Sequence, residues 1–425
     1  MRKYARYKDL GISWIGEVPE HWNYYPFYAL FEQKSQCGFC DEELLSVYLD
    51  KGVIRFSDAG EKRANATSED LSKYQLVEEG DFVLNNQQAW RGSVGVSFFR
   101  GIVSPAYVIL KMSEKLERTF ANYLLRDRSM VAMYCLASKG VGSIQRNLVW
   151  NKVKRSAIFI PPLPEQKAIA EYLDKKTAQI NELVSAKQKQ IELLKEYKQS
   201  VIANAVTGKI DERREKRKWE DSGISWIGKI PENWEKLPFC ALFEQKSQCG
   251  YCDEELLSVY LDKGVIRFSD GGEKRANATS EDLSKYQLVD VGDFVLNNQQ
   301  AWRGSVGVSF FRGIVSPAYV ILKMSAKLDR NFANYLLRDR SMVAMYCICS
   351  KGVGSIQRNL VWNKLKRMPV FIPPLSKQKE IVAYIEKKVS SIDSQIASIE
   401  NQIANLNEYK QSLISDVVTG KVKVC

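Results

Sequence analysis

Histidine, cysteine and long apolar runs are scarce in this sequence, and each scarcity excludes a class of protein. His21 is the single histidine among 425 residues. No apolar run approaches the roughly 18 residues that cross a bilayer, and the basic N-terminal residues lack the apolar core of a signal peptide. Nine cysteines are too few for a disulfide scaffold in a chain of this length, so reduced thiols are expected. The sequence therefore predicts a cytoplasmic protein without a membrane partner.

Signatures of catalysis are also missing. The chain has no phosphate-binding P-loop and no glycine-rich dinucleotide fingerprint. Residues 160–163, Ile-Pro-Pro-Leu, lack the acidic or amide residue and the aromatic residue that flank two prolines in adenine methyltransferases. We therefore expect no catalytic residues, no cofactor and no enzymatic activity of the chain by itself.

Positive charge is in excess. Lysine and arginine number 62 against 50 acidic residues, which gives a formal net charge of +12. Such an excess favours a polyanionic partner, either a nucleic acid or an acidic membrane face. The hydrophobic content of 45% is that of an ordinary globular protein, and the length allows two or three domains.

The chain is one unit written twice, at an offset of 212 residues without any gap. Trp22 recurs as Trp234 and Pro161 as Pro373. A period this long means two whole domains rather than a stack of small repeats. His21 falls on an asparagine in the second copy, so a duplicated nuclease site cannot be built on histidine. Between residues 29 and 113, four positions differ from the second copy: Phe39/Tyr251, Ala59/Gly271, Glu78/Asp290 and Glu79/Val291.

Each copy combines a mixed globular part with a long helix, which predicts an α+β fold. Apolar patterning predicts strands at 43–50, 80–85, 93–99 and 106–111, and a helix at 120–138. Prolines at 161 and 162 then end the globular part. We expect a first globular domain at 1–163, a first helix at 164–208, a linker and second domain at 209–375, and a second helix at 376–420.

The two long helices carry a narrow apolar stripe. Apolar residues recur at spacings of three and four over about five heptads, which favours a coiled coil. The alternative is a helix that packs only on its own domain. Gly208 and Gly420 are expected to end the helices. The stripe includes Ile180, Val184, Ile191, Leu194 and Val201 in the first helix, and Ile392, Ile396, Ile399, Ile403 and Leu406 in the second.

Chain connectivity predicts that the helices pair antiparallel. Only the charged residues 209–218 separate the first helix from the second domain, so the second helix begins near the far end of the first. Parallel pairing would require the chain to cross back along the whole helix, about 60 Å. Two direct repeats joined in this way are related by a rotation of about 180°, a pseudo-two-fold axis through the helix pair.

A polar segment at 85–92, repeated at 297–304, is the first candidate for nucleic-acid contact. Asparagine and glutamine pair with adenine, and arginine pairs with guanine, in the major groove. Trp90 either stacks on a base or fills the core. The alternative is an Asx-type turn with a buried tryptophan. The candidate base contacts are Gln87, Gln88 and Arg91, with Gln299, Gln300 and Arg303 in the second copy.

A glycine-rich segment at 138–147, repeated at 350–359, is the second candidate. Glycines permit close approach of the backbone, and basic side chains meet phosphates. The alternative is a helix C-cap followed by a solvated turn. Gln145 and Gln357 are candidates for base contact. The candidate backbone contacts are Lys139, Gly140, Gly142, Ser143 and Arg146, with Lys351, Gly352, Gly354, Ser355 and Arg358.

Paired cysteines have the spacing of a zinc knuckle in both copies, as Cys37 with Cys40 and Cys249 with Cys252. A structural zinc site needs four ligands, and neither copy offers a second such pair. Ordinary reduced cysteines and no bound metal are therefore expected.

The order of these parts resembles a known family. The motifs GISWIGEVPEHW at 11–22, IPPLPEQ at 160–166 and VTGK at 206–209 recur as GISWIGKIPENW at 223–234, IPPLSKQ at 372–378 and VTGK at 418–421. In this order and doubled, they resemble the specificity subunits of Type I restriction–modification systems over the whole chain. The glycine-rich segment also resembles one that lies late in each recognition domain of that family.

The resemblance implies a non-catalytic, sequence-specific DNA-binding subunit in a prokaryotic, nucleoid-associated complex. It implies double-stranded DNA and two modification (methyltransferase) subunits as partners, with ATP-dependent restriction subunits in systems that cleave. Members generally carry two dissimilar recognition domains, whereas these two are nearly identical, so the expected site is an interrupted palindrome methylated on adenine. The alternative is a coiled-coil adaptor with only non-specific DNA affinity, and dependence of binding on sequence discriminates the two.

Overall fold

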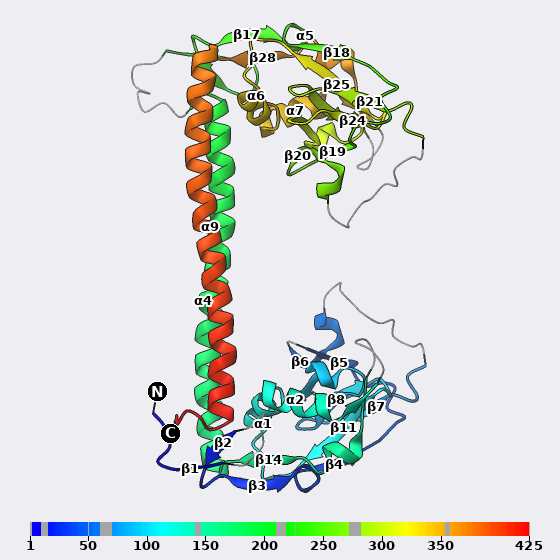
Figure 1. The fold of residues 1–425 in the computed structure, drawn as a ribbon, viewed down its shortest axis with the longest axis vertical. Helices are drawn as coiled ribbons and strands as arrows, with labels where there is room; N and C mark the ends of the chain where they lie inside the picture. Colours follow the sequence, from blue (N-terminus) through cyan, green and yellow to red (C-terminus); the bar gives the residue numbers. More distant parts are fainter. Residues whose placement is uncertain are drawn as a thin grey trace. The chain divides into compact units, whose positions relative to one another are not determined.

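The computed structural model describes residues 2–9, 16–49, 51–59, 70–140, 146–209, 218–225, 227–271, 282–352 and 358–424. They form two compact units, one of Met1–Lys187 with Glu400–Cys425 and the other of Gln188–Ile399. Each unit contains one globular domain and part of each long helix (Figure 1). No helix in this described part of the chain is long and apolar enough to cross a membrane.

The globular domain of the first unit is built from short antiparallel strands. Its central sheet has the order β4 (Phe31–Lys34), β11 (Tyr107–Met112), β8 (Phe82–Asn85) and β9 (Val94–Val96). The α+β class and the four expected strands are confirmed. Two-stranded pairs accompany the sheet: β1 (Tyr7–Asp9) with β2 (Glu17–Pro19), β3 (Asn23–Pro26) with β14 (Ala157–Ile160), β5 (Leu45–Tyr48) with β6 (Gly52–Arg55), β7 (Gln75–Val77) with β10 (Gly101–Val103), and β12 (Ser138–Lys139) with β13 (Asn147–Leu148).

The helix expected at 120–138 is wrong as a single element. Asp127 divides it, because its side chain accepts the backbone N–H of Ser129 at 2.9 Å and caps a new helix. No proline or glycine marks this break, so the apolar periodicity runs through it. The helices of this domain are α1 (Arg118–Leu125), α2 (Arg128–Leu136) and α3 (Trp150–Val153), with the short 3-10 helices η1 (Phe27–Ala29), η2 (Phe56–Ala59) and η3 (Ala89–Arg91).

The central sheet is buried on both faces. Phe82 and Leu84 of β8 belong to the main core, where Phe27 stacks on Phe31 with 4.2 Å between ring centroids. Val83, which points to the opposite face, belongs to a second apolar cluster with residues of β5, β6 and β10. A strand buried on both faces carries a continuous apolar run instead of an alternating one, which accounts for the sequence of β8.

The second unit repeats this architecture 212 residues later. Its central sheet has the order β18 (Phe243–Lys246), β25 (Tyr319–Met324), β22 (Phe294–Asn297) and β23 (Val306–Val308). Its other elements are β15 (Trp219–Asp221), β16 (Lys229–Pro231), β17 (Glu235–Pro238), α5 (Phe239–Leu242), β19 (Leu257–Tyr260), β20 (Gly264–Arg267), η5 (Phe268–Gly271), β21 (Gln287–Val289), η6 (Ala301–Arg303), β24 (Gly313–Val315), α6 (Arg330–Leu337), α7 (Arg340–Ile348), β26 (Ser350–Lys351), β27 (Asn359–Leu360), α8 (Trp362–Leu365) and β28 (Pro369–Ile372).

Two helices of 44 residues, α4 (Leu163–Val206) and α9 (Leu375–Val418), pack together in both units (Figure 1). As residue numbers rise along one helix, the numbers of their partners fall along the other. The pairing is therefore antiparallel, as the connectivity predicts. Polar contacts mark it: Lys187 with Gln402 at 2.5 Å and Lys410 with Asn181 at 3.0 Å in the first unit, and Lys198 with Asp393 at 2.7 Å in the second.

The apolar stripe of these helices is largely shielded from solvent. The alternative interpretation of the stripe also holds in part, because Ile169 and Leu173 of α4 belong to the core of their own domain. Each long helix thus begins as part of a domain and continues as part of a helix pair. Of the stripe residues, Ile180, Ile191, Val201, Ile392 and Ile399 are buried, and Val184, Leu194, Ile396, Ile403 and Leu406 are partly buried.

A buried glutamine fastens each domain to the first turn of its long helix. Gln166 is 1% exposed, and its Oε1 accepts the backbone N–H of Glu117 at 2.8 Å. Its Nε2 donates to the carbonyls of Lys115 and Pro161, both at 2.9 Å. Gln378 makes the same three bonds in the second unit. The glutamine that ends the IPPLPEQ motif therefore ties the loop before α1 to the start of α4.

Replacing Gln166 by leucine should lower the free energy of unfolding by at least about 3 kcal/mol. The change keeps a similar volume but removes three hydrogen bonds: it leaves the carbonyl of Pro161 buried without a partner, and the N–H of Glu117 and the carbonyl of Lys115 partly buried without one. A buried polar group without a partner costs about 1–3 kcal/mol. Urea denaturation followed by tryptophan fluorescence measures the loss. Gln188→Leu, at an exposed position of the same helix, is the matched control and should change stability by less than about 0.5 kcal/mol. Equal effects of the two changes would contradict this role.

Candidate nucleic-acid interface

The polar segment at 85–92 connects β8 to β9. The side chain of Asn85 accepts the backbone N–H of Gln87 at 3.1 Å, which makes an Asx turn, and η3 follows. Gly92 closes the turn at φ +99°, in the left-handed region that glycine adopts without strain. The Asx turn considered as the alternative is therefore present. The hydrogen bonds of this turn do not use the side chains of Gln87, Gln88 or Arg91, which are left to make contacts.

The turn leaves its candidate base contacts accessible. Gln87 and Arg91 are exposed and Gln88 is half-buried. Trp90 is half-buried, so it does not fill the core, and its indole N–H donates to the carbonyl of Gln87 at 3.0 Å. This hydrogen bond of the indole stabilises the turn. The second unit repeats this arrangement with Gln299, Gln300, Trp302 and Arg303.

The glycine-rich segment at 138–147 is held at both ends by a short hairpin. Ser138 and Lys139 of β12 pair with Leu148 and Asn147 of β13. Lys139 and Gly140 are exposed, whereas Arg146 is half-buried. In the second unit, Lys351 and Gly352 are exposed and Arg358 is half-buried. The other candidates of this segment lie outside the described residues: Gly142, Ser143, Gln145, Gly354, Ser355 and Gln357.

The structure brings the two candidate segments together. The backbone N–H of Leu148 donates to both the carbonyl and the side-chain oxygen of Asn86, each at 3.2 Å. The guanidinium carbon of Arg146 lies over the Trp90 ring at 5.0 Å from its centroid, and that of Arg91 lies at 5.8 Å. We call Trp90, Arg91 and Arg146 the Trp–Arg cluster. Trp302, Arg303 and Arg358 form the same cluster in the second unit, with distances of 4.9 Å for Arg358 and 5.7 Å for Arg303.

The Trp–Arg cluster holds positive charge that no acid in the described part of the chain neutralises. Arg6, Arg55, Arg100 and Arg118 of the first unit form ion pairs within the described ranges, whereas no ion pair there involves Arg91 or Arg146. In addition, the Nε of Arg146 is buried without a hydrogen-bond acceptor. Withdrawing a charged donor from water without a partner costs free energy. Because the charges of Arg91 and Arg146 are not paired within the described ranges, the cluster is suited to a ligand that offers negative charge.

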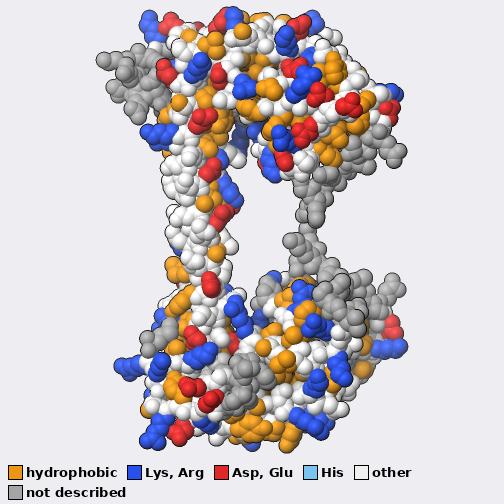
Figure 2. Space-filling view, viewed as in Figure 1, with side chains coloured by type: hydrophobic (Ala, Val, Ile, Leu, Met, Phe, Trp, Pro, Cys, Tyr) orange, Lys and Arg blue, Asp and Glu red, His pale blue; other side chains and the backbone are white. Residues whose placement is uncertain are grey.

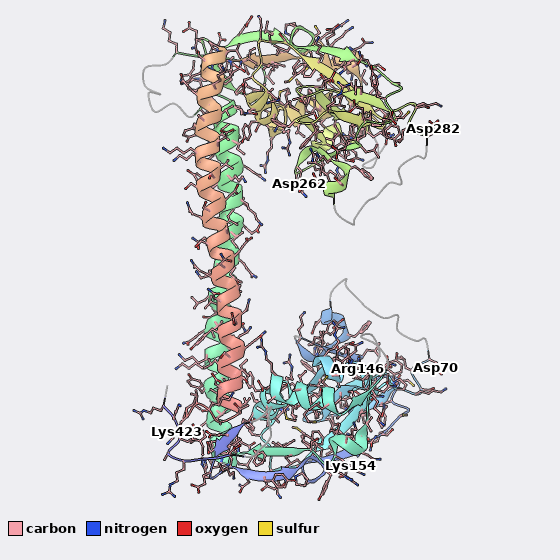
Figure 3. The ribbon with its side chains drawn as sticks, in the orientation of Figure 1. Asp70, Arg146, Lys154, Asp262, Asp282 and Lys423 are labelled. Atoms are coloured by element: carbon pink, nitrogen blue, oxygen red, sulfur yellow. The ribbon has the colours of Figure 1, made fainter. Side chains whose placement is uncertain are left out.

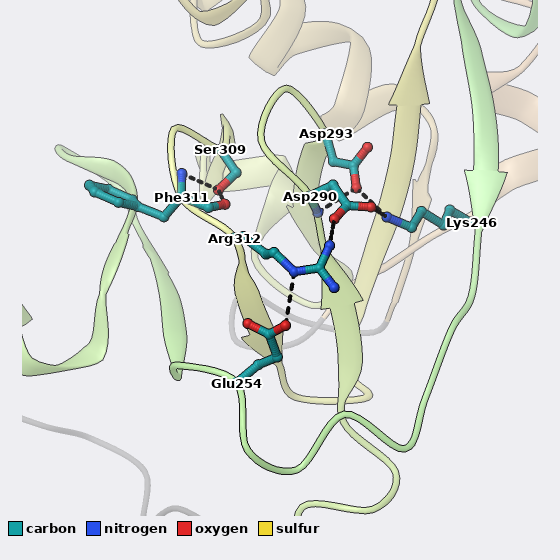
Figure 4. A network of polar contacts seen from close by, with 7 residues as sticks. All are labelled: Lys246, Glu254, Asp290, Asp293, Ser309, Phe311 and Arg312. Atoms are coloured by element: carbon teal, nitrogen blue, oxygen red, sulfur yellow. Dashed lines mark hydrogen bonds and ion pairs between the residues drawn. The ribbon is translucent and has the colours of Figure 1, made fainter.

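In a second polar cluster, by contrast, the charged side chains pair with one another. Figure 4 shows Lys246 bonded to Asp290 at 2.5 Å and Asp293 at 2.8 Å, while Arg312 pairs with Glu254 at 2.8 Å and also with Asp290. Burial would lower the pKa of Lys246, but its hydrogen bonds to the two aspartates raise it above the ordinary value. The hydrogen bond from Lys246 in turn lowers the pKa of Asp290. These opposite charges join β18, the turn before β22 and the residues that precede β19 and β24, which is a structural role.

Net positive charge does not by itself locate the interface. Lysine and arginine side chains are spread over the visible face of each unit and are mixed with acidic ones (Figure 2). In the first domain, Arg146 lies toward β5 and β6, whereas Lys154 lies toward β4 and β14 (Figure 3). The geometry of the Trp–Arg cluster therefore identifies the candidate interface better than a count of basic residues does.

The paired cysteines give no sign of a metal site. Cys37, Cys40, Cys249 and Cys252 are exposed free thiols. Across the described ranges, no group of three or more histidine, cysteine, aspartate or glutamate side chains could hold a metal ion.

The chain thus contains two copies of one module, an α+β domain that carries the Trp–Arg cluster and continues into a long helix. A family model described as the Type I restriction modification DNA specificity domain matches residues 19–193 and 231–408. These ranges cover most of the chain, so the chain belongs to the family of Type I restriction–modification DNA specificity subunits. Within that family it is a specificity subunit, the non-catalytic component of the complex. The adaptor alternative is thereby set aside.

Individual relatives agree with this assignment. The chain is 25% identical to the MjaVIII specificity subunit of Methanocaldococcus jannaschii over 431 residues, which cover 96% of this chain and 94% of the relative. It is 24% identical to the EcoKI specificity subunit of Escherichia coli K12 over 287 residues, which cover 62% of this chain and 57% of the relative.

Solved structures share the fold. A chain from work on complex assembly and conformational transition of the type I R-M system matches with a TM-score of 0.62 at 14% identity, over 95% of this chain and 99% of that one. The HsdS subunit from Thermoanaerobacter tengcongensis matches with a TM-score of 0.51 at 14% identity, over 95% of this chain and 98% of that one. At these identities the likeness establishes the fold alone.

Proposed function

We propose that the chain directs adenine methylation on both strands of an interrupted palindrome in double-stranded DNA. Each domain reads one half-site through its two candidate segments. In the first domain, the proposed base contacts are Gln87, Gln88, Arg91 and Gln145, and the proposed backbone contacts are Lys139, Gly140, Gly142, Ser143 and Arg146. In the second domain, the proposed base contacts are Gln299, Gln300, Arg303 and Gln357, and the proposed backbone contacts are Lys351, Gly352, Gly354, Ser355 and Arg358.

The observation that carries this proposal is the identity of the two reading surfaces. Residues 85–92 and 138–147 are the same, position by position, as residues 297–304 and 350–359. The Trp–Arg clusters also agree in geometry, at 5.0 and 4.9 Å for the arginine of the glycine-rich segment. Because base discrimination depends on which side chains meet the base edges and at what angle, two identical surfaces should select the same bases.

The antiparallel helices favour a palindrome over a direct repeat. Each domain leads into its long helix through the same motif, and the two helices run in opposite directions where they pair. The second domain would then be turned by about 180° and would meet the opposite DNA strand, as in two-fold symmetric proteins on palindromic sites. A half-site on one strand is then followed, after unread base pairs, by its reverse complement.

Methyl transfer in this proposal comes from two modification subunits bound to the helix pair. Tyr197 of α4 and Tyr409 of α9 are equivalent in the repeat and are 52% and 48% exposed. Leu183 and Leu193 of α4 are exposed as well. Leu193 and Tyr197 lie one turn apart on α4, and neighbouring exposed apolar side chains favour protein contact more than singly scattered ones do. Restriction subunits, ATP-dependent nucleases, would join where the system also cleaves DNA, as the names of the relatives as restriction enzymes suggest.

Reconstitution tests this function directly. The purified chain should neither methylate nor cut DNA, because it carries no cofactor-binding or catalytic motif. Addition of its modification subunits should give transfer of labelled methyl groups from S-adenosylmethionine to DNA, and omission of this chain should abolish sequence-specific transfer. Robust methyl transfer by the isolated chain would contradict the proposal.

Neutralising the exposed lysine of the glycine-rich segment should weaken binding to every DNA sequence. Each of the changes Lys139→Gln and Lys351→Gln removes one proposed phosphate contact, so each should lower the slope of log affinity against log salt by about one unit. Fluorescence anisotropy across a salt series measures the slope. Lys189→Gln, at an exposed position of α4, is the control and should leave the slope unchanged. If the salt slope stays unchanged in both Lys139→Gln and Lys351→Gln, the glycine-rich segment does not contact the DNA.

A further inference from the structure

Arg146 and Arg358 differ from the other basic residues of the candidate interface in being held rigidly. Arg91 and Lys139 are exposed, whereas Arg146 is half-buried. Its guanidinium lies over the Trp90 ring at 5.0 Å, and its Nη1 contacts the Sγ of Cys135 at 3.6 Å. Its Nε is enclosed without an acceptor. Arg358 repeats all three features, at 4.9 Å from the ring of Trp302 and 3.4 Å from the Sγ of Cys347.

These contacts fix the plane of the guanidinium group. Contact with an aromatic ring, enclosure of Nε and the contact of Nη1 with a cysteine sulfur restrict rotation about the side chain. Nη2 and the second N–H of Nη1 remain to bind a ligand. Arginine differs from lysine in offering donors in a rigid planar fork, which can engage two acceptors side by side. Holding that fork in advance lowers the entropy that is lost when it binds. The structure thus prepares Arg146 and Arg358 for a ligand with two adjacent acceptors.

We infer that Arg146 and Arg358 each read the edge of a guanine in the major groove of the DNA half-site. Guanine offers O6 and N7 as adjacent acceptors, whereas adenine has a donor in place of O6, and pyrimidines lack N7. The inference rests on the proposed function and gives these two arginines a base-reading role in place of the backbone contact expected from the sequence. Trp90 and Trp302 are positioning residues that hold the two guanidinium forks.

A phosphate is the other acceptor that duplex DNA offers. The restricted orientation of the guanidinium argues against a phosphate as its partner. Phosphate oxygens accept hydrogen bonds from many directions, and contacts to them position a protein without reading sequence. The exposed Lys139, in the same segment as Arg146, already provides charge for that purpose. A rigid fork adds orientation, and orientation is what discriminates one base edge from another. Because both copies of the cluster are the same, the inference requires one guanine contact in each half-site.

The variant Arg358→Lys tests this inference, because it keeps the charge but removes the fork. Full-length protein would be used to select binding sites from duplexes randomised across both half-sites. Wild type should select the palindrome. The variant should lose its preference at a single G:C pair in one half-site only, with discrimination there reduced about 5- to 150-fold, as expected for a lost bidentate contact. The other half-site, read by the unaltered first domain, should keep every preference and serves as an internal control.

Three further measurements make the result decisive. The salt slope should not change in Arg358→Lys, since lysine keeps the charge. Trp302→Phe, which retains an aromatic ring, should cause a milder loss at the same base pair. Arg146→Lys should relax the symmetry-related pair in the other half-site. The inference would be overturned if Arg358→Lys kept every base preference of the wild type. It would also be overturned if the variant lost its preference at an A:T pair instead of a G:C pair. Failure of the wild type to select any motif would instead refute the proposed function.

Discussion

A duplex with one base pair added to the spacer should bind this protein at least about 100-fold more weakly than the natural site. One base pair moves the second half-site by about 3.4 Å and turns it by about 34° around the DNA axis. The 44-residue helices α4 and α9 connect the two domains, and Gln166 and Gln378 fasten each domain to its helix. On the proposed function, we expect that domains fastened in this way do not follow both the shift and the turn, so one half-site contact is lost. Loss of one of two linked contacts costs about 10²- to 10⁴-fold in affinity.

Competition binding with a series of duplexes measures this effect. The half-sites stay constant while the spacer is shortened by one pair, kept, or lengthened by one pair. The matched control changes the identity of the spacer bases at constant length and should leave affinity unaltered, because the spacer is not read. Equal affinity for all three lengths would show that the domains adjust freely to the DNA, contrary to this account.

Ile180→Asp should lower the free energy of unfolding by about 3–5 kcal/mol, the cost of a buried charge without a partner. Ile180 is 5% exposed and shares a buried cluster with Leu413 and Val417 of α9. Neither of these neighbours can pair with a carboxylate. Leu183→Asp lies less than one turn away on α4, where the side chain is 52% exposed, and it should change stability by less than about 0.5 kcal/mol.

Thermal denaturation followed by circular dichroism separates these two variants, because unfolding of the helices dominates the signal. The comparison isolates burial, since both variants place the same charge on the same helix. Comparable stabilities of Ile180→Asp and Leu183→Asp would mean that the apolar stripe does not hold α4 against α9.

The long helices were predictable because a stripe of apolar residues at helical spacing has few other solutions. The same signal failed at Asp127, where the stripe continues across a break. There a single side chain caps α2 through the N–H of Ser129, and this local hydrogen bond outweighs the periodic pattern. Strand β8 was predictable for a different reason, since Phe82, Val83 and Leu84 are buried on both faces of the sheet.

The candidate interface was predictable in its parts and not in its assembly. Both polar segments carry the residue types that contact DNA, and both are identical in the two copies. The contact of Arg146 with Trp90 depends on the pairing of Leu148 with Asn86, which joins segments far apart in the chain. No local pattern reports such a contact. Likewise, the three hydrogen bonds of Gln166 follow from the folded position of the loop before α1, and the sequence motif alone does not reveal them.

The methylated motif in host DNA tests the central claim most directly. Methylation-sensitive sequencing of the genome, with and without the gene for this chain, identifies every adenine whose modification depends on it. This account predicts one interrupted palindrome of fixed spacing with one methylated adenine on each strand, because two nearly identical domains are proposed to meet opposite strands. A motif made of two unrelated half-sites, or of a direct repeat, would contradict it.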